Sequence, residues 1–251
     1  GFLKDANALE ALLQYRDNTD VLENLQAIKR KNKVRLAAYI AEHNGINVDP
    51  DSIFDVQVKR LHEYKRQLLK VLHILTLYND IKDHPEKPVY PQTFIFAAKA
   101  SPGYYLAKQI ISLIVAASNL VNSDPQVQNK LKVVFIEDYK VSLAEIIIPA
   151  ADLSEQISVA GKEVLQMLTS GVLGQRFDDV AASLLTPRFG AADSYMTVAD
   201  FASYKAAKAH AVEIYQDRTR FAKMSLTNIA RAGIFSSDRS VKQYAKEIWN
   251  L

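Results

Sequence analysis

A dense group of basic side chains occupies one short stretch of the sequence. Its five members are Lys59, Arg60, His62, Lys65 and Arg66. Cations gathered where a strand feeds a helix suit a dianion such as phosphate, because free backbone N–H groups and the helix dipole add to their attraction. A solvated basic helix face is the alternative, and composition alone favours it. The position after a strand, at the mouth of a parallel sheet, shifts the balance toward a phosphate site.

Other functional groups follow two later apolar runs. Lys99 comes directly after one of them, where a lysine can meet a ligand. Glu137 and Asp138 follow the other, and paired carboxylates there can bind a hydroxylated ligand or exchange protons. The alternative interpretations are helix capping by Ser101-Pro102 and ordinary turn chemistry.

These groups depend on elements that alternate between strands and helices. Residues 53–58 alternate apolar and polar like a strand, and residues 93–98 and 133–136 are typical of short buried strands. Helical spacing follows each of them, so that the basic group occupies the first two turns of the first helix. This order predicts a parallel sheet with right-handed crossovers and ligands at the carboxyl ends of its strands. The predicted fold is α/β, a Rossmann-like parallel sheet flanked by helices.

Helical spacing also dominates both ends of the chain. The first fifty residues are spaced as helices, the last of which ends near Asn44-Gly45. A further helix is predicted to begin at Ser101-Pro102, with proline at its first position. From residue 164 onward the sequence is almost wholly helical.

The composition is that of an ordinary globular chain. Hydrophobic residues make up 49% and charged residues 24%, which argues against disorder. The formal net charge of +3 gives little reason to expect a nucleic acid partner. Cysteine is absent, which excludes disulfides and Cys-ligated metals, and the histidines lack ligand spacing, so no metal site is expected. The apolar run 110–117 is too short for a membrane span, and we expect a soluble, cytoplasmic protein.

Glycine is scarce. The chain has 8, where average usage predicts roughly 18. Phosphate-binding enzymes often use glycine for close backbone approach, so either that chemistry is absent or a glycine-rich segment is missing.

The stretch 54–69, which contains the basic group, closely resembles a signature of the glycogen (α-glucan) phosphorylases. The resemblance continues, in the same order, through residues 99–104, 137–145, 148–158, 235–239 and 244–249. It implies that residues 1–251 are the C-terminal, cofactor- and phosphate-binding domain of a two-domain glycosyltransferase of the GT-B type. The active site of such an enzyme lies between its two domains.

The resemblance also implies an activity and a set of site residues. Enzymes of this family use pyridoxal 5'-phosphate to cleave terminal α-1,4-glucosidic bonds of glycogen or maltodextrin with inorganic phosphate, releasing glucose 1-phosphate. Lys59 matches the contact to the cofactor phosphate, and Tyr139 matches a residue lining the cofactor pocket. Arg60 and Lys65 match the contacts to the substrate phosphate, with His62 nearby. Full-length members are expected to be cytoplasmic homodimers.

Some positions depart from the family pattern. Glu163 matches a glutamate that binds a sugar hydroxyl, but the glycine-rich turn and the Schiff-base lysine that follow it in the family are absent. Val164 instead begins a segment resembling a later helix, which implies a gap or deletion near residues 161–164 and a fragment inactive by itself. Such a loss also explains the glycine shortage. Smaller departures are Ala97-Ala98, where two glycines are usual, and Asp138, where asparagine is common.

Two other functions fit parts of the pattern. A nucleotide-sugar glycosyltransferase uses a similar two-domain cleft but binds a nucleotide diphosphate without pyridoxal phosphate. A non-catalytic sugar- or anion-binding module would need only the basic group. Cofactor absorbance of the full-length protein would separate a phosphorylase from both.

Overall fold

A computed structural model describes residues 5–127, 129–154, 162–187 and 192–249, without the side chains of residues 162–164. The chain forms two compact units. The larger comprises residues 30–212, and the smaller combines residues 1–29 with residues 213–251.

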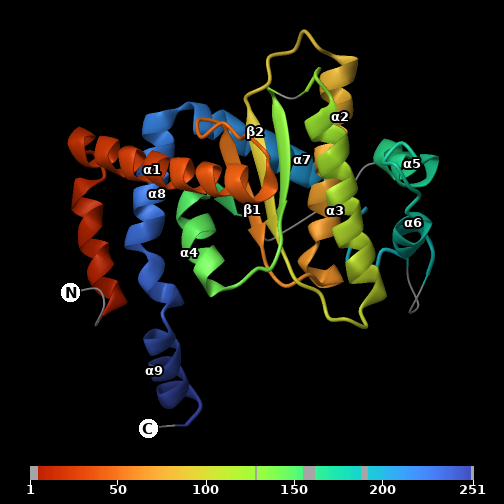
Figure 1. The fold of residues 1–251 in the computed structure, drawn as a ribbon. Helices are drawn as coiled ribbons and strands as arrows, with labels where there is room; N and C mark the ends of the chain where they lie inside the picture. The colour runs from red at the N-terminus through yellow and green to blue at the C-terminus, as the bar shows by residue number, and fades with distance from the viewer. Residues whose placement is uncertain (1–4, 128, 155–161, 188–191, 250–251) are drawn as a thin grey trace. The chain divides into compact units, whose positions relative to one another are not determined.

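A four-stranded parallel sheet forms the centre of the larger unit (Figure 1). The strand order is β3-β2-β1-β4, with bounds Leu131–Ile136, Gln92–Ala97, Ile53–Val58 and Leu153–Ser154. Val58 pairs with Ala97, and Ala97 pairs with Ile136, so the three long strands end level with one another. The predicted Rossmann-like α/β fold is confirmed. β4 was not predicted, because two residues are too few for a periodic pattern.

Helices cover both faces of this sheet, making three layers (Figure 1). One face packs against α1 (Thr19–Asn44) and α4 (Val141–Ala150), and the other against α2 (Gln67–Asp83) and α3 (Tyr105–Ser123). Alternation along β2 divides the core, since Phe94 and Phe96 join the α2–α3 side and Ile95 and Ala97 the α1–α4 side. The sheet is therefore buried on both faces, as parallel sheets usually are.

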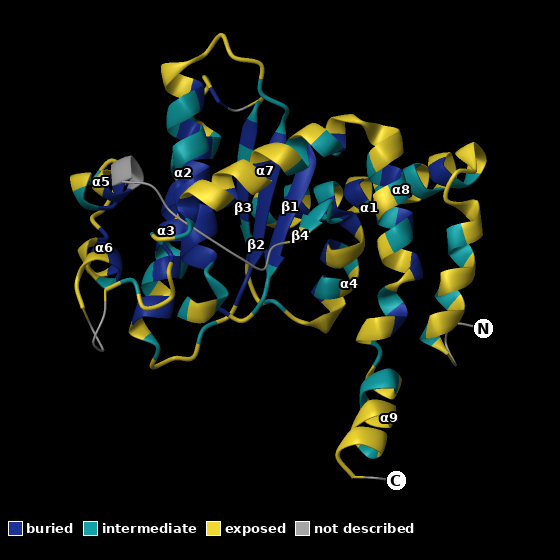
Figure 2. Cartoon of the chain, turned by 180° about the vertical axis from the view of Figure 1, so that it is seen from behind, coloured by how far each residue is buried: buried dark blue, intermediate teal, exposed yellow. Residues whose placement is uncertain are grey.

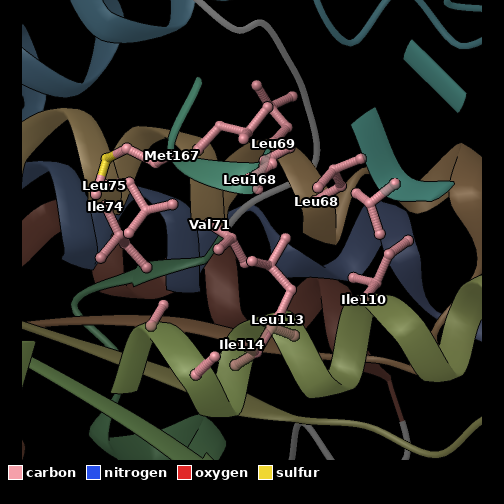
Figure 3. Close-up of a cluster of buried hydrophobic side chains, with 14 of the residues drawn as sticks. Leu68, Leu69, Val71, Ile74, Leu75, Ile110, Leu113, Ile114, Met167 and Leu168 are labelled. Atoms are coloured by element: carbon pink, nitrogen blue, oxygen red, sulfur yellow. The ribbon is translucent and has the colours of Figure 1, made fainter. Parts of the chain in front are cut away.

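The α2–α3 side holds the larger apolar cluster (Figure 3). There Val71 of α2 lies near Leu113 of α3, and Leu168 comes from α5 (Lys162–Ser170). Complete burial of one such side chain contributes about 1.5–3 kcal/mol. By length and composition α3 could cross a membrane, but half of its apolar window is buried inside this core.

β4 is fastened to its neighbours by a buried ion pair. The carboxylate of Asp152 accepts a hydrogen bond from the backbone N–H of Phe54 at 2.9 Å and contacts Nζ of Lys33 in α1 at 2.5 Å. Both charged side chains are almost completely buried. The strand that leads into residues 155–163 is thereby held beside β1.

Two helix boundaries are informative. α1 ends at Asn44 as predicted, and Gly45 adopts a φ of 66°, the left-handed conformation that glycine favours after a helix. The predicted start of α3 at Ser101-Pro102 is wrong. Tyr104 donates its backbone N–H to the Ser101 carbonyl at 3.0 Å, so these residues form a turn and the helix begins at Tyr105.

The smaller unit is helical. Besides the start of α1 and the end of α7 (Phe201–Gln216), it contains η1 (Ala6–Tyr15), α8 (Arg218–Ala230), η3 (Ala232–Phe235) and α9 (Ser237–Glu247). Leu22, Ala222 and Leu226 form its core. A Cβ at Gly233 would lie 2.7 Å from Oδ1 of Asn7, so close packing requires glycine there. α9 is largely exposed (Figure 2).

Candidate functional site

The loops that follow β1, β2 and β3 meet at the carboxyl edge of the sheet. The backbone N–H of Lys59 donates to the carbonyl of Ala97 at 3.2 Å, and the N–H of Leu61 donates to the carbonyl of Lys99 at 2.9 Å. The loop after β1 thus continues the pairing of β1 with β2 beyond the strands. The sequence prediction that the basic group and Lys99 share one edge is confirmed by these bonds.

The basic group does not lie in the first two turns of a helix, which corrects the prediction. Lys59 and the two residues after it continue beyond β1, and a short 3₁₀ turn, η2, covers Glu63–Lys65. Arg66 then takes a left-handed φ of 57°, and α2 begins only at Gln67. The amide pairing with the β2 loop extends the chain, and the left-handed residue separates η2 from α2. The basic side chains therefore come from a loop that ends at Arg66, the residue before α2, and not from the first two turns of a helix.

Two of the basic residues are tied directly to each other. Nζ of Lys65 donates to the backbone carbonyl of Arg60 at 2.9 Å. Gln57, at the end of β1, donates its side-chain amide to the carbonyl of Lys65 at 3.2 Å. Arg60 is exposed, and Lys59 and Lys65 are half-buried. The loop thus holds the Lys65 ammonium group in place against the backbone of Arg60, whose own side chain is exposed.

His62 lies on the same loop between two aromatic rings. Its ring centroid is 4.6 Å from that of Tyr64 and 5.1 Å from that of Tyr104. Its Nδ1 is buried and has no hydrogen-bond partner among the described residues. The ring is therefore held by packing against these two aromatic rings.

Tyr104 fastens the loop after β2 to the loop after β1. Its hydroxyl donates to Oε1 of Glu63 at 2.6 Å and accepts the backbone N–H of Glu63 at 3.4 Å. Burial, together with the Glu63 carboxylate, raises the pKa of Tyr104 to about 12. The hydroxyl therefore remains a donor at neutral pH, and the contact persists.

Arg66 is the member of the basic group that pairs with a carboxylate from a distant part of the chain. Its guanidinium contacts Oδ2 of Asp200, which precedes α7, at 3.3 Å. Sequence reasoning placed all five basic side chains around one anion, and the structure gives Arg66 a different partner.

The loop after β3 adds another charged group. Asp138 contacts Nζ of Lys99 at 2.6 Å and Nζ of Lys140 at 3.1 Å. Hydrogen bonding to Lys99 and then to Lys140 holds the pKa of Asp138 below its ordinary value. It is an ionised partner of two lysines and not one of a pair of carboxylates exchanging protons. Tyr139 is half-buried and packs against the α1–α4 side of the core.

Glu163 stands apart from these residues. It belongs to the first turn of α5, and its side chain lies outside the described residues. Its predicted contact with a sugar hydroxyl stays a prediction.

The larger unit also contains a buried cluster of charged residues that was not predicted from the sequence. Asp55 of β1 accepts from Nζ of Lys70 at 2.7 Å and also contacts Nζ of Lys208 from α7. Burial alone would raise the pKa of Asp55, but Lys208 and Lys70 outweigh it and hold the pKa below its ordinary value. The sequence did hold one sign of this cluster, because Asp55 and Lys70 are charged residues inside the apolar runs of β1 and α2. Nothing in the sequence indicates that Lys208, which lies 153 residues away on α7, is their partner.

Comparison with known proteins decides the family. A family model described as carbohydrate phosphorylase matches residues 1–165 and again residues 162–251. The chain belongs to the carbohydrate phosphorylase family. Its relatives include the muscle form of glycogen phosphorylase from Oryctolagus cuniculus, 35% identical over all of this chain and 38% of that protein. The brain form from Bos taurus and the liver form from Homo sapiens are also 35% identical, over 99% and 100% of this chain.

This phosphorylase chain spans 38% of the length of the muscle-form relative. The alignment extends over 317 residues, whereas the chain has 251, so the relative carries residues within the matched region that the chain lacks. The two family matches meet at residues 162–165, beside the break predicted near 161–164. Residues 155–161 lie outside the described part, so the prediction of a break stays a prediction.

The described residues of this phosphorylase chain suit the phosphate of pyridoxal phosphate better than its aldehyde. Lys59, Arg60 and Lys65 supply the cations that a phosphate ester needs. Covalent attachment needs a lysine amine able to lose its proton. At this edge Lys99 and Lys140 contact Asp138, and Lys65 donates to a carbonyl. The basic residues of this loop fit the cofactor's phosphate, whereas Lys99, Lys140 and Lys65 are held as charged partners and do not suit its covalent attachment.

Proposed function

We propose that this chain is the phosphate-binding, C-terminal half of an enzyme that cleaves terminal α-1,4-glucosidic bonds of an α-glucan with inorganic phosphate, releasing glucose 1-phosphate. The observation that carries the proposal is the loop after β1, where Arg60 and Lys65 are joined at the carboxyl edge of the sheet. Family membership supports the same chemistry, because the relatives are named glycogen phosphorylases.

Arg60 and Lys65 hold the substrate phosphate in this proposal. In the reaction a phosphate oxygen bonds to C1 of the terminal glucose while the bond from C1 to the glycosidic oxygen breaks and that oxygen gains a proton. Cations fixed beside the phosphate stabilise the charge that shifts during this exchange. Lys65 is ordered by the backbone carbonyl of Arg60 and by the side-chain amide of Gln57 in β1, so little reorganisation is needed when phosphate arrives. His62 stands beside this pair, and Glu163 would bind a sugar hydroxyl.

Pyridoxal 5'-phosphate is the proposed cofactor of the whole protein. When bound, it supplies a phosphate group that acts as acid and base toward the substrate phosphate. From this chain Lys59 would hold the cofactor phosphate and Tyr139 would line its pocket. The attachment lysine is proposed to lie in the residues that the relatives carry and this chain lacks. The chain alone is therefore inactive, and the whole protein is a cytoplasmic homodimer without nucleic acid or membrane partners.

Phosphate titration of this chain tests the proposal. Arg60→Ala and Lys65→Ala should each weaken binding of inorganic phosphate about ten- to a hundredfold, the equivalent of losing roughly 1.5–3 kcal/mol per charged hydrogen bond. Lys132→Ala removes the same charge near the amino end of β3 and should leave affinity unchanged. Equal affinity in all variants would overturn the assignment. Preference for a nucleoside diphosphate over phosphate would favour a nucleotide-sugar transferase instead.

A further inference from the structure

Asp138 joins two lysines from different loops at the carboxyl edge of the sheet. Its Oδ1 lies 2.6 Å from Nζ of Lys99, in the loop after β2, and its Oδ2 lies 3.1 Å from Nζ of Lys140. The three side chains are 49%, 64% and 60% exposed for Lys99, Asp138 and Lys140 respectively, so solvent and salt reach all of them. The carboxylate therefore offsets positive charge at the place where an anion would bind.

The backbone at Asp138 restricts which residues can stand there. Its φ of 52° lies in the left-handed region, which among non-glycine residues asparagine and aspartate adopt most readily. Asparagine has nearly the same shape and tolerates the same backbone. Asp138→Asn thus removes the charge and leaves the turn intact.

The lysines that Asp138 holds share an edge with the basic loop. Leu61, two residues after Lys59, donates to the carbonyl of Lys99, so the backbone of Lys99 adjoins that loop directly. An anion bound there competes with Asp138 for Lys99 and Lys140, and it is also repelled by the carboxylate. Both effects weaken anion binding while Asp138 is ionised.

We propose that Asp138 is a positioning residue that lowers the phosphate affinity of this edge by holding Lys99 and Lys140 in ion pairs. The inference rests on the proposed function, because it assumes that the edge binds phosphate. Beyond the proposed function, it states that Asp138 limits the affinity of this edge for phosphate, so that bound phosphate can be released.

Calorimetric titration of the chain with inorganic phosphate tests this role. At low salt Asp138→Asn should bind phosphate roughly two- to fivefold more tightly, the range expected for an exposed ion pair. The gain should shrink at high salt, because screening weakens exposed pairs. It should also shrink when Lys99→Gln is combined with Asp138→Asn, an outcome that a purely structural effect would not produce.

Asp51→Asn is the matched control. Asp51 is 63% exposed and pairs with Arg30 at 2.9 Å, but it precedes β1 and so lies at the opposite end of that strand. It should leave phosphate affinity unchanged although it alters net charge equally. Equal or weaker binding by Asp138→Asn, with phosphate still bound by the unaltered chain, would overturn this inference alone. Absence of phosphate binding in both chains would overturn the proposed function as well.

Discussion

Nζ of Lys70 lies 2.7 Å from Oδ1 of Asp55 in the interior of the larger unit, and both side chains are completely buried. Lys70 also donates to the backbone carbonyl of Asp55 at 3.0 Å, and Lys208 approaches the second carboxylate oxygen. One carboxylate in β1 therefore connects that strand with α2 and α7. Removing one partner of such a group leaves uncompensated buried charge, which costs far more than the loss of a surface pair.

Asp55→Ala should accordingly be severely destabilising. It removes the buried carboxylate that balances the charges of Lys70 and Lys208, and we expect the free energy of unfolding to fall by about 3–5 kcal/mol. Urea unfolding followed by circular dichroism measures this. Asp51→Ala, which breaks an exposed pair with Arg30, should cost less than about 1 kcal/mol. Similar losses in the two variants would show that the buried cluster has no special role.

His73 should make stability depend on pH. Burial, followed by the nearby Lys208, lowers the pKa of His73 from 6.5 to about 3. The unfolded chain then binds a proton that the folded chain refuses, so stability falls as pH drops from about 6.5 toward 3, by up to about 1.4 kcal/mol per pH unit.

The matched variant is His73→Phe. The ring of His73 packs against aromatic rings that include Phe94 and Tyr204, and its Nδ1 has no hydrogen-bond partner in the described part of the chain. Phenylalanine should therefore fit and reduce the slope of unfolding free energy against pH. His43→Gln, which replaces an exposed histidine, should leave that slope unchanged. An unchanged slope in His73→Phe would contradict the assignment.

The contact between Tyr104 and Glu63 should stabilise the loop after β1. Tyr104→Phe removes a half-buried bond to a carboxylate, and we expect a loss of about 1 kcal/mol together with weaker phosphate binding. Tyr105→Phe is the control, because Tyr105 is exposed and makes a comparable 2.7 Å bond to Asp179 away from this loop. Thermal unfolding and phosphate titration measure both. If the two variants behave alike, the contact does not order the loop.

The parts of the fold that follow from local periodicity were predictable. β1, β2 and β3 lie within two residues of their predicted bounds, because alternation and apolar runs reflect burial directly. The start of α2 could not be predicted in this way. It depends on Arg66 adopting a left-handed φ and on backbone amides of the loop after β1 pairing with the loop after β2. Neither leaves a local pattern.

The candidate site divides in the same way. The sequence placed Lys59, Lys99 and Asp138 after consecutive strands, and parallel topology then brings those loops to one edge. The ion pairs of Lys99 with Asp138 and of Arg66 with Asp200 join residues far apart in the sequence and depend on where their side chains point. Periodicity carries no information about such pairs.

The cofactor should bind this chain weakly. At the site edge Lys99 and Lys140 make ion pairs with Asp138 and Lys65 donates to a carbonyl, and Lys59 is assigned to the cofactor phosphate, so we expect no specific imine with pyridoxal phosphate. Borohydride reduction after incubation, followed by peptide mapping, should show no lysine labelled stoichiometrically. Stoichiometric labelling of one lysine in this chain would contradict the proposal that the attachment site lies in the residues it lacks.

The position of bound phosphate tests the central claim most directly. Titration of the ¹⁵N-labelled chain with inorganic phosphate, followed by amide chemical shifts, maps that position without requiring activity. We predict that the shifts concentrate in residues 59–66, 98–100 and 137–140, which are the loops at the carboxyl edge of the sheet. Shifts confined to the opposite edge, around Ser52, Thr93 and Lys132, or the absence of any shift would contradict the claim that this edge is a phosphate site.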